Sequence, residues 1–348
     1  MSCKESTVND KVEQNWFTSG SSAVGFGTAG IFREARKKKR QRLLDAALDA
    51  GITHFDTAAI YGLGLAEGEL GRAIRGRRDG IRLVSKVGIG LTPLGKMLGR
   101  VQGPMRMILE SSPLLQRRAQ SSAASPTSGP LGALLYRDTY DEKAAQRSLD
   151  NSLRHLGTDH LDLLLLHDPS PTRTRLEGVY EVLERAQAAG KISSWGVAGE
   201  LDQTLAVVEQ LPGPSSVLQI RDDIFRQDEY LSRPAHCEYL ITFGVLGRAL
   251  PAIIAHITAS KERTRSWNDT VGVDCTKSEA VAGFLMMDAV RANPLGTVLY
   301  STTRPERIQG MIATLSGVAN QENHSFKQFR QLVDRELKTN GASLKDEQ

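Results

Sequence analysis

The chain has 348 residues, a formal net charge of +4, and 24% charged against 40% hydrophobic residues. This composition is ordinary for a globular enzyme, and the length allows either two ordinary domains or one large α/β barrel. So mild a charge does not by itself support binding to nucleic acid or to a membrane surface, and we expect neither partner.

The densest basic cluster is REARKKKRQR, residues 33–42, which runs directly into the helical pattern LLDAALDAG at 43–51. We interpret the cluster as the solvated first turn of an amphipathic helix. A nucleic-acid patch is the alternative.

The three cysteines, Cys3, Cys237 and Cys275, are widely spaced and form no C-x-x-C motif. This spacing argues against a disulfide framework and against a zinc site, so we expect no metal and a reducing compartment. The polar segment 1–17 lacks the apolar stretch of a secretory signal, and no apolar run approaches the ~18 residues of a membrane helix. We therefore expect a cytoplasmic protein.

Short apolar runs alternate with helical patterns through most of the chain, which is typical of parallel strands joined by helical crossovers. The predicted strands occupy residues 22–28, 52–56, 81–86, 160–167, 192–197, 216–220, 239–245 and 297–301. The predicted helices end at residue 50 or occupy 66–76, 140–157, 174–190, 201–211, a stretch near 227–237, 281–294 and 304–316. An open doubly wound sheet also uses this alternation, but eight repeats favour a closed (β/α)8 TIM barrel.

The pattern predicts a single barrel domain over residues 21–320, preceded by an extension at 1–20. Residues 88–139 separate the third strand from its helix and include the turn-rich SSAASPTSGP, so we expect a long active-site loop there. A C-terminal helix and a flexible tail are expected over 321–348.

The stretch HFDTAAIYGLGLAEGELG, residues 54–71, carries four glycines that invite comparison with a nucleotide-binding loop. The G-x-G-x-x-G motif fails because Glu67 stands at its last glycine, and no lysine completes a phosphate loop. We favour turns and close packing as the role of Gly62, Gly64, Gly68 and Gly71.

Three ionisable residues end successive predicted strands, and a fourth lies in the loop after the second strand. These residues are Asp56, Lys86, His167 and Tyr61. A lone histidine is more often a satisfied core residue, and a lone lysine can be a solvated strand end. Together, at the edge where barrel enzymes build their active sites, the four predict one shared site.

The chemistry of such a site follows from charge. An ammonium beside a phenol favours the phenolate and lowers the phenol pKa, and a carboxylate holds a buried ammonium in its charged form. A neighbouring imidazole can orient a carbonyl oxygen by hydrogen bonding. This set predicts a carbonyl-polarising, proton-donating site whose natural complement is a hydride donor.

The residues also match a known family. The segments GITHFDTAAIYGLGLAEGELGRAI, VSKVG, RSLDNSLRHLGTDHLDLLLLHDP and TTRPERI resemble the aldo-keto reductases, over roughly residues 22–314. The match is closest to the branch that contains aldose 1-dehydrogenases. The resemblance implies a barrel that binds NADP(H) or NAD(H) across its strand ends, and a catalytic tetrad of Asp56, Tyr61, Lys86 and His167.

The resemblance further implies a set of cofactor-binding residues beside Asp56. In this set Gly27 and Thr28 lie near the nicotinamide, Gln219 holds the carboxamide and Phe243 stacks on the nicotinamide ring. A 2′-phosphate suits Ser301, Arg304 and Arg307 because arginine matches phosphate oxygens, which favours NADP(H) over NAD(H). For these arginines a solvated helix start is the alternative.

Two departures from the family pattern remove hydrogen-bonding groups. Ala198 and Gly199 stand where the family has Ser-Asn on the carboxamide, and Met311 stands at the position of an asparagine near the adenine.

The sequence thus predicts an NAD(P)-dependent oxidoreductase acting on a small carbonyl or sugar substrate. The alternative is a non-catalytic cofactor-binding or interaction module on the same barrel, against which the complete tetrad argues. No feature of the sequence indicates the substrate's identity, the physiological direction or the oligomeric state.

Overall fold

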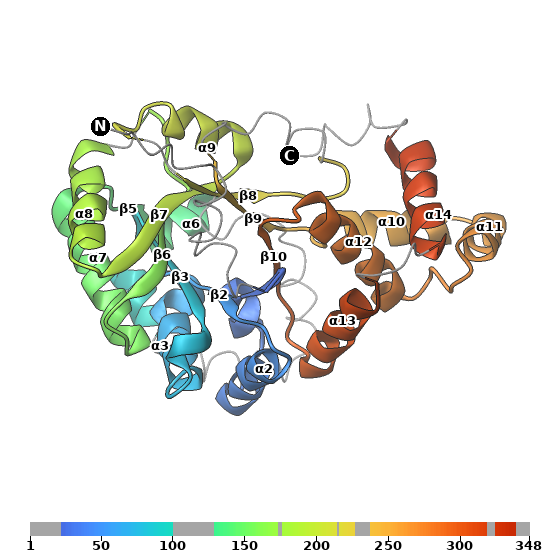
Figure 1. The fold of residues 1–348 in the computed structure, drawn as a ribbon, viewed down its shortest axis with the longest axis horizontal. Coiled ribbons are helices and arrows are strands. Elements are labelled where there is room, and N and C mark those ends of the chain that lie inside the picture. Colours follow the sequence, from blue (N-terminus) through green and yellow to red (C-terminus); the bar gives the residue numbers. More distant parts are fainter. Residues whose placement is uncertain are drawn as a thin grey trace, which may run out of the picture.

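The computed structural model describes residues 22–99, 129–172, 176–213, 216–226, 237–318 and 324–338. Eight parallel strands form a closed barrel in the order β1-β10-β9-β8-β7-β6-β3-β2, so the predicted (β/α)8 fold is confirmed (Figure 1). The strands are β1 (Val24–Gly27), β2 (His54–Asp56), β3 (Arg82–Val87), β6 (Leu161–His167), β7 (Ile192–Gly199), β8 (Val217–Arg221), β9 (Tyr239–Phe243) and β10 (Thr297–Tyr300).

Helices cover the outside of the barrel and alternate with its strands. They are α2 (Lys37–Asp49), α3 (Ala66–Ala73), α7 (Glu142–Leu156), α8 (Leu176–Ala188), α9 (Leu201–Val208), α12 (Ser278–Ala292) and α13 (Pro305–Val318). The residues at their ends explain where they begin and stop. Asp141 accepts a hydrogen bond from the backbone of Ala144 at the start of α7, and Gly157 ends it in the left-handed conformation with φ 67°. The helix expected near 227–237 falls on residues 227–236, which lie outside the described part of the chain.

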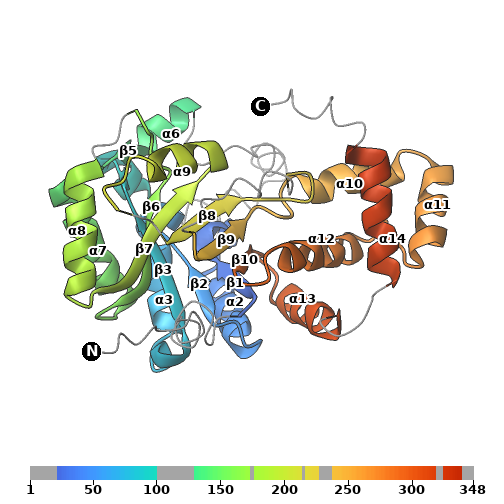
Figure 2. The ribbon, with the colours of Figure 1, turned by 45° about the horizontal axis from the view of Figure 1, so that its top comes forward.

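Two helices between β9 and α12 were not predicted. They are α10 (Ala249–Thr258) and α11 (Lys261–Val271), and with α14 (His324–Val333) they form a helical group on the side of the barrel opposite α7 and α8 (Figures 1 and 2). The group packs around Trp267, whose ring meets that of Phe329 edge-on, while Phe284 stacks on Phe329. The short π-helical turn η5 (Asp334–Lys338) closes this group, because Glu336 accepts a hydrogen bond from the Trp267 indole.

The stretch after β3 has secondary structure at its ends. β4 (Ile89–Leu91) pairs antiparallel with β5 (Tyr136–Asp138), and α6 (Gly129–Leu135) leads into β5. Residues 100–128, with most of the turn-rich segment, lie outside the described residues. Within the described ranges, no helix is long and apolar enough to cross a bilayer.

One residue of the basic cluster is buried rather than solvated. Arg40 is 6% exposed, and its Nε and Nη2 each donate to a Glu69 carboxylate oxygen at 2.7 Å, which joins α2 to α3. Its Nη1 donates to the carbonyls of Glu34 and Ala35, and the guanidinium lies 4.2 Å from the Phe32 ring centroid. These contacts satisfy the charge that the first turn of α2 buries.

We predict that Glu69→Gln lowers the free energy of unfolding by about 3–5 kcal/mol, because it leaves the buried Arg40 charge without its partner. Urea unfolding followed by circular dichroism measures the change. The control is Asp49→Asn, which breaks the exposed Arg77–Asp49 pair and should cost less than about 1 kcal/mol. Equal effects of the two variants would contradict the prediction.

Candidate active site

The carboxyl ends of β2 and β3 bring Asp56 and Lys86 together inside the barrel mouth. Lys86 Nζ donates to both carboxylate oxygens of Asp56 at 2.7 Å and to the carbonyl of Thr57 at 3.0 Å. Each of the two side chains is at most 4% exposed. Burial lowers the pKa of Lys86, and the Asp56 carboxylate opposes that shift, so the pair holds an ammonium in a site that water does not reach.

Tyr61 and His167 complete the group that the sequence predicted. Tyr61 begins the 3-10 turn η2 (Tyr61–Gly64) after β2, and its ring centroid lies 5.1 Å from Lys86 Nζ. His167 ends β6, and its ring meets that of Tyr61 edge-on, with centroids 5.7 Å apart. The turn depends on Gly62, which has φ 59° and where a Cβ would lie 2.3 Å from the Phe32 ring. Gly62 therefore serves the turn that positions Tyr61, as the sequence predicted for the glycines of residues 54–71.

The protonation states differ in one respect from the sequence-based expectation. Burial, reinforced by the carboxylates of Asp56 and Asp168, raises the pKa of Tyr61 well above its ordinary value. Burial outweighs the lowering that was expected from Lys86. Burial, then the Lys86 charge, lowers the pKa of His167 to about 3. At neutral pH the site therefore holds a protonated phenol beside a neutral imidazole.

Two further side chains support these four through contacts that were not predicted from the sequence. Gln219 of β8 donates from Nε2 to Asp56 Oδ2 at 2.8 Å, which leaves its Oε1 as an acceptor. Tyr140 donates its hydroxyl to the backbone carbonyl of His167 and packs against Gly88, where φ is 109°. Asp56 thus has donors from two strands, and His167 is fixed through its backbone.

The residues expected near the nicotinamide cluster at the end of β1. Gly27 stands beside Asp56 in the strand register, and a Cβ there would lie 2.8 Å from Ser301 Oγ. Ser301 in turn donates to the Gly27 carbonyl at 2.7 Å, and the buried Thr28 donates to Thr57 at 2.9 Å. The structure brings Gly27, Thr28 and Ser301 together with Asp56 at one edge of the barrel.

The remaining predicted cofactor residues end β9 and begin α13. Phe243 is partly buried at the end of β9, with the Arg221 guanidinium 5.2 Å from its ring centroid. Arg304 is exposed at the start of α13, whereas Arg307 donates to Glu279 at 2.8 Å. A helix N-terminus with an exposed arginine fits a phosphate, and Arg304 is the freer of the two arginines.

At the nicotinamide end of the expected cofactor path, the last two residues of β7, Ala198 and Gly199, have no side-chain donor. Ala198 is buried, and a Cβ on Gly199 would lie 3.1 Å from Thr204 Oγ1 and 3.2 Å from Asp168 Oδ1. Thr204 and Asp168 thus crowd the space beside Gly199. Met311 of α13 is buried in the hydrophobic core.

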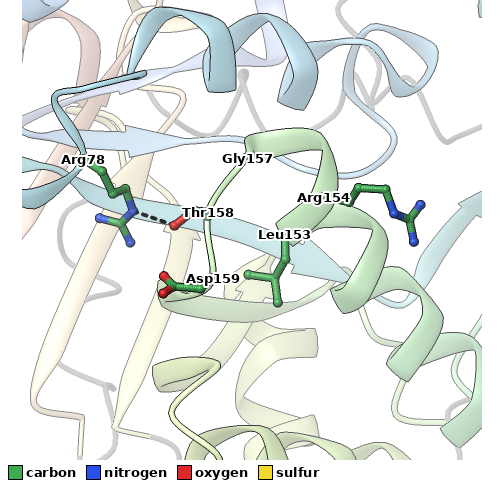
Figure 3. A pocket seen from close by; sticks show the side chains of 6 residues that line it. All are labelled: Arg78, Leu153, Arg154, Gly157, Thr158 and Asp159. Atoms are coloured by element: carbon green, nitrogen blue, oxygen red, sulfur yellow. Dashed lines mark hydrogen bonds between the residues drawn. The ribbon is translucent and has the colours of Figure 1, made fainter.

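A hollow at the opposite end of the barrel is separate from this site. It is lined by Arg78, Leu153, Arg154, Gly157, Thr158 and Asp159, which precede β3 and β6 (Figure 3). Arg78 is held by Thr158 at 3.2 Å and by Asp162 at 2.7 Å, so its charge is already satisfied. We assign this hollow no role in the chemistry.

Comparison with known proteins agrees with this geometry. Residues 23–235 match the model of the aldo/keto reductase family. A D-threo-aldose 1-dehydrogenase from a Pseudomonas species is 28% identical over 190 residues, which cover 53% of this chain and 51% of that protein. The chain thus matches the curated relatives over about half of their length.

Solved structures share the fold. A glycerol dehydrogenase from Gluconobacter oxydans superposes with a TM-score of 0.65 at 17% identity, covering 91% of this chain and 93% of that one. An aldo-keto reductase from Klebsiella pneumoniae in complex with NADPH gives a TM-score of 0.59 at 22% identity and covers 90% of each chain.

His54, two residues before Asp56, should make the stability of the fold depend on pH. It is 2% exposed, its Nε2 has no hydrogen-bond partner among the described residues, and burial lowers its pKa from 6.5 to about 4. Between those values the unfolded chain binds a proton that the folded chain excludes. Stability is therefore fully present above pH 6.5 and falls by up to about 1.4 kcal/mol per pH unit as the pH drops toward 4.

Urea unfolding between pH 7.5 and pH 5 tests this. His54→Gln should reduce the dependence on pH by about one proton, whatever its effect on stability at pH 7.5. The exposed His324→Gln should leave the dependence unchanged. A His54→Gln variant with the parent's pH dependence would refute the prediction.

Proposed function

Because the chain belongs to the aldo/keto reductase family, we propose that it catalyses hydride transfer between a nicotinamide dinucleotide and a carbonyl or alcohol substrate. The observation that carries the proposal is the buried Asp56–Lys86 pair, set beneath Tyr61 and beside His167. We propose these four as the catalytic residues of a catalytic unit over residues 21–320. The nicotinamide supplies or takes the hydride when bound.

The protein groups handle the proton. In reduction, the Tyr61 phenol donates its proton to the carbonyl oxygen, and Lys86 stabilises the phenolate that remains. Asp56 holds the ammonium in place, and neutral His167 donates a hydrogen bond that orients the carbonyl. In oxidation, the phenolate of Tyr61 takes the proton of the alcohol. At neutral pH the raised Tyr61 pKa keeps the phenol in the acid form that the reduction step uses.

We propose NADP(H) as the preferred cofactor, with NAD(H) as a possible substitute. At the nicotinamide end, which is common to both dinucleotides, we propose Gly27, Thr28, Gln219 and Phe243 as the binding residues. A Cβ at Gly27 would lie 2.8 Å from Ser301 Oγ, and the Gln219 Oε1 can accept from a carboxamide. The start of α13, with Ser301, Arg304 and Arg307, suits the 2′-phosphate. The lack of donors at Ala198 and Gly199 shifts affinity toward the phosphate end.

The substrate class that we propose is a small aldehyde, ketone or aldose. Its support is the match to a protein named for aldose dehydrogenation. The three widely spaced cysteines suit a reducing compartment, and on that ground we place the protein in the cytoplasm. We propose no nucleic-acid or membrane partner.

A second candidate function is a cofactor-binding module without catalysis, favoured by the missing donors of β7. Two assays separate the candidates: NADPH oxidation with aldehydes and ketones, and NADP+ reduction with free aldoses. Turnover in either direction supports the enzyme. Dinucleotide binding without any turnover supports the module instead.

We predict that Tyr61→Phe lowers turnover by about 10²- to 10⁴-fold, the usual contribution of a general acid, while NADPH binding stays close to that of the parent. Fluorescence titration measures binding, and initial rates measure turnover. Tyr180→Phe is the matched control, since Tyr180 packs on Trp195 outside the barrel and its loss of a hydroxyl should leave turnover unchanged. Retained turnover in Tyr61→Phe would show that another group supplies the proton.

We predict that Arg304→Ala weakens NADPH binding by about ten- to a hundredfold, as expected for a lost hydrogen bond to a charged group, and leaves NADH binding unchanged. Arg307→Ala should have a smaller effect on NADPH because Glu279 already pairs with that side chain. Isothermal titration with both dinucleotides checks this. Equal weakening for NADH and NADPH would remove Arg304 from the 2′-phosphate site.

A further inference from the structure

Asp168 directly follows the predicted catalytic histidine and belongs to none of the roles assigned so far. Its Oδ2 lies 3.9 Å from His167 Nε2, and its carboxylate is close enough to contribute to the raised pKa of Tyr61. The side chain is 40% exposed, which leaves it open to the mouth of the barrel. A carboxylate therefore stands beside the two groups that would hold a reacting carbonyl oxygen.

The backbone holds Asp168 in a conformation that is uncommon for a residue with a side chain. Its φ is 47°, in the left-handed region, and its N–H donates to the Ala198 carbonyl at 2.7 Å. Aspartate tolerates this region better than most residues. The bond to β7 fixes the direction of the side chain, so the carboxylate lies against Gly199, where a Cβ would come within 3.2 Å of Oδ1.

No hydrogen bond to the carboxylate is found among the described residues, and the neutral His167 has its Nε2 3.9 Å from Asp168 Oδ2. Desolvation by burial, reinforced by the Glu200 carboxylate, raises the Asp168 pKa, while the charges of Lys86 and Arg221 oppose the shift. With 40% of its side chain exposed, the carboxylate is hydrated in the free protein, and a ligand hydroxyl can replace that water as the donor. Its position leaves the substrate as the natural source of that donor.

We propose that Asp168 is a specificity-determining residue, whose carboxylate accepts a hydrogen bond from a hydroxyl on the carbon next to the reacting carbonyl. The two oxygens of an α-hydroxy carbonyl compound lie about one hydrogen-bond length apart, so one substrate can reach His167 Nε2 and Asp168 Oδ2 together. The site then takes α-hydroxy aldehydes and ketones, open-chain sugars included, in preference to plain ones. This inference rests on the proposed oxidoreductase function.

The test compares lactaldehyde with propionaldehyde, which differ by a single α-hydroxyl, in NADPH-dependent reduction. Asp168→Asn and Asp168→Gly are suitable variants because both residues tolerate the left-handed backbone. We expect the parent to favour lactaldehyde. Asp168→Gly should lower kcat/KM for lactaldehyde by about ten- to a hundredfold, the value of a hydrogen bond to a charged group, mainly through KM. Its kcat/KM for propionaldehyde should change by less than about threefold.

The pH profile adds a readout that a purely structural role would not move. As the pH falls through the raised Asp168 pKa, the carboxyl gains a proton and becomes a weaker acceptor, so the lactaldehyde KM of the parent should rise. Asp168→Asn should show a higher KM with no such rise. NADPH binding, measured by fluorescence, should match the parent in both variants.

Three results would overturn the inference. Equal losses for both aldehydes would mean that Asp168 acts on the backbone of His167. Weakened NADPH binding would assign the carboxylate to the cofactor. A parent that reduces both aldehydes without preference would reject the inference and leave the proposed function intact, whereas a parent that reduces no carbonyl compound would reject the proposed function itself.

Discussion

The buried pair of Asp56 and Lys86 is the interaction on which the candidate site depends. Two opposite charges removed from water are stable only with good geometry and satisfied hydrogen-bonding groups. Here the ammonium makes three hydrogen bonds, and Asp56 receives another from Gln219. The pair ties β2 to β3, and Gln219 extends the connection across the barrel to β8. The same burial, with the Asp56 carboxylate, raises the pKa of Tyr61, so the phenol stays protonated at neutral pH.

Much of the fold could be predicted because parallel barrels place an apolar run at every strand and a helical pattern after it. Strand ends such as Asp56 and His167 are visible in the sequence because a polar residue interrupts an apolar run. The helices α10 and α11 were missed since their pattern was absorbed into the connection between two expected elements. Arg40 was assigned to a solvated turn because a buried arginine is recognisable only from its partner, Glu69, 29 residues away.

The candidate site shows the same division. The positions of its residues at strand ends could be predicted, whereas the contacts between their side chains could not. The gathering of Asp56, Tyr61, Lys86 and His167 follows from topology, since all four come from one edge of the barrel. The bond between Gln219 and Asp56, and the position of Asp168 against Gly199, depend on side-chain directions that spacing does not reveal. The direction of the Tyr61 pKa shift could not be predicted from the sequence either. Burial outweighs the neighbouring charge at Tyr61, and no sequence pattern measures burial.

Ala198 and Gly199, which stand where the family has Ser-Asn, are best understood together with the position of Asp168. Without side chains that reach from Ala198 and Gly199, the end of β7 leaves room for the carboxylate of Asp168, which is held there by its own backbone bond to Ala198. A side chain at 199 would compete for the space that Oδ1 fills. The polar group at this end of the site therefore comes from the residue that directly follows β6 and His167. In the site that we propose, the absence of donors at the end of β7 goes together with a carboxylate placed for substrate recognition.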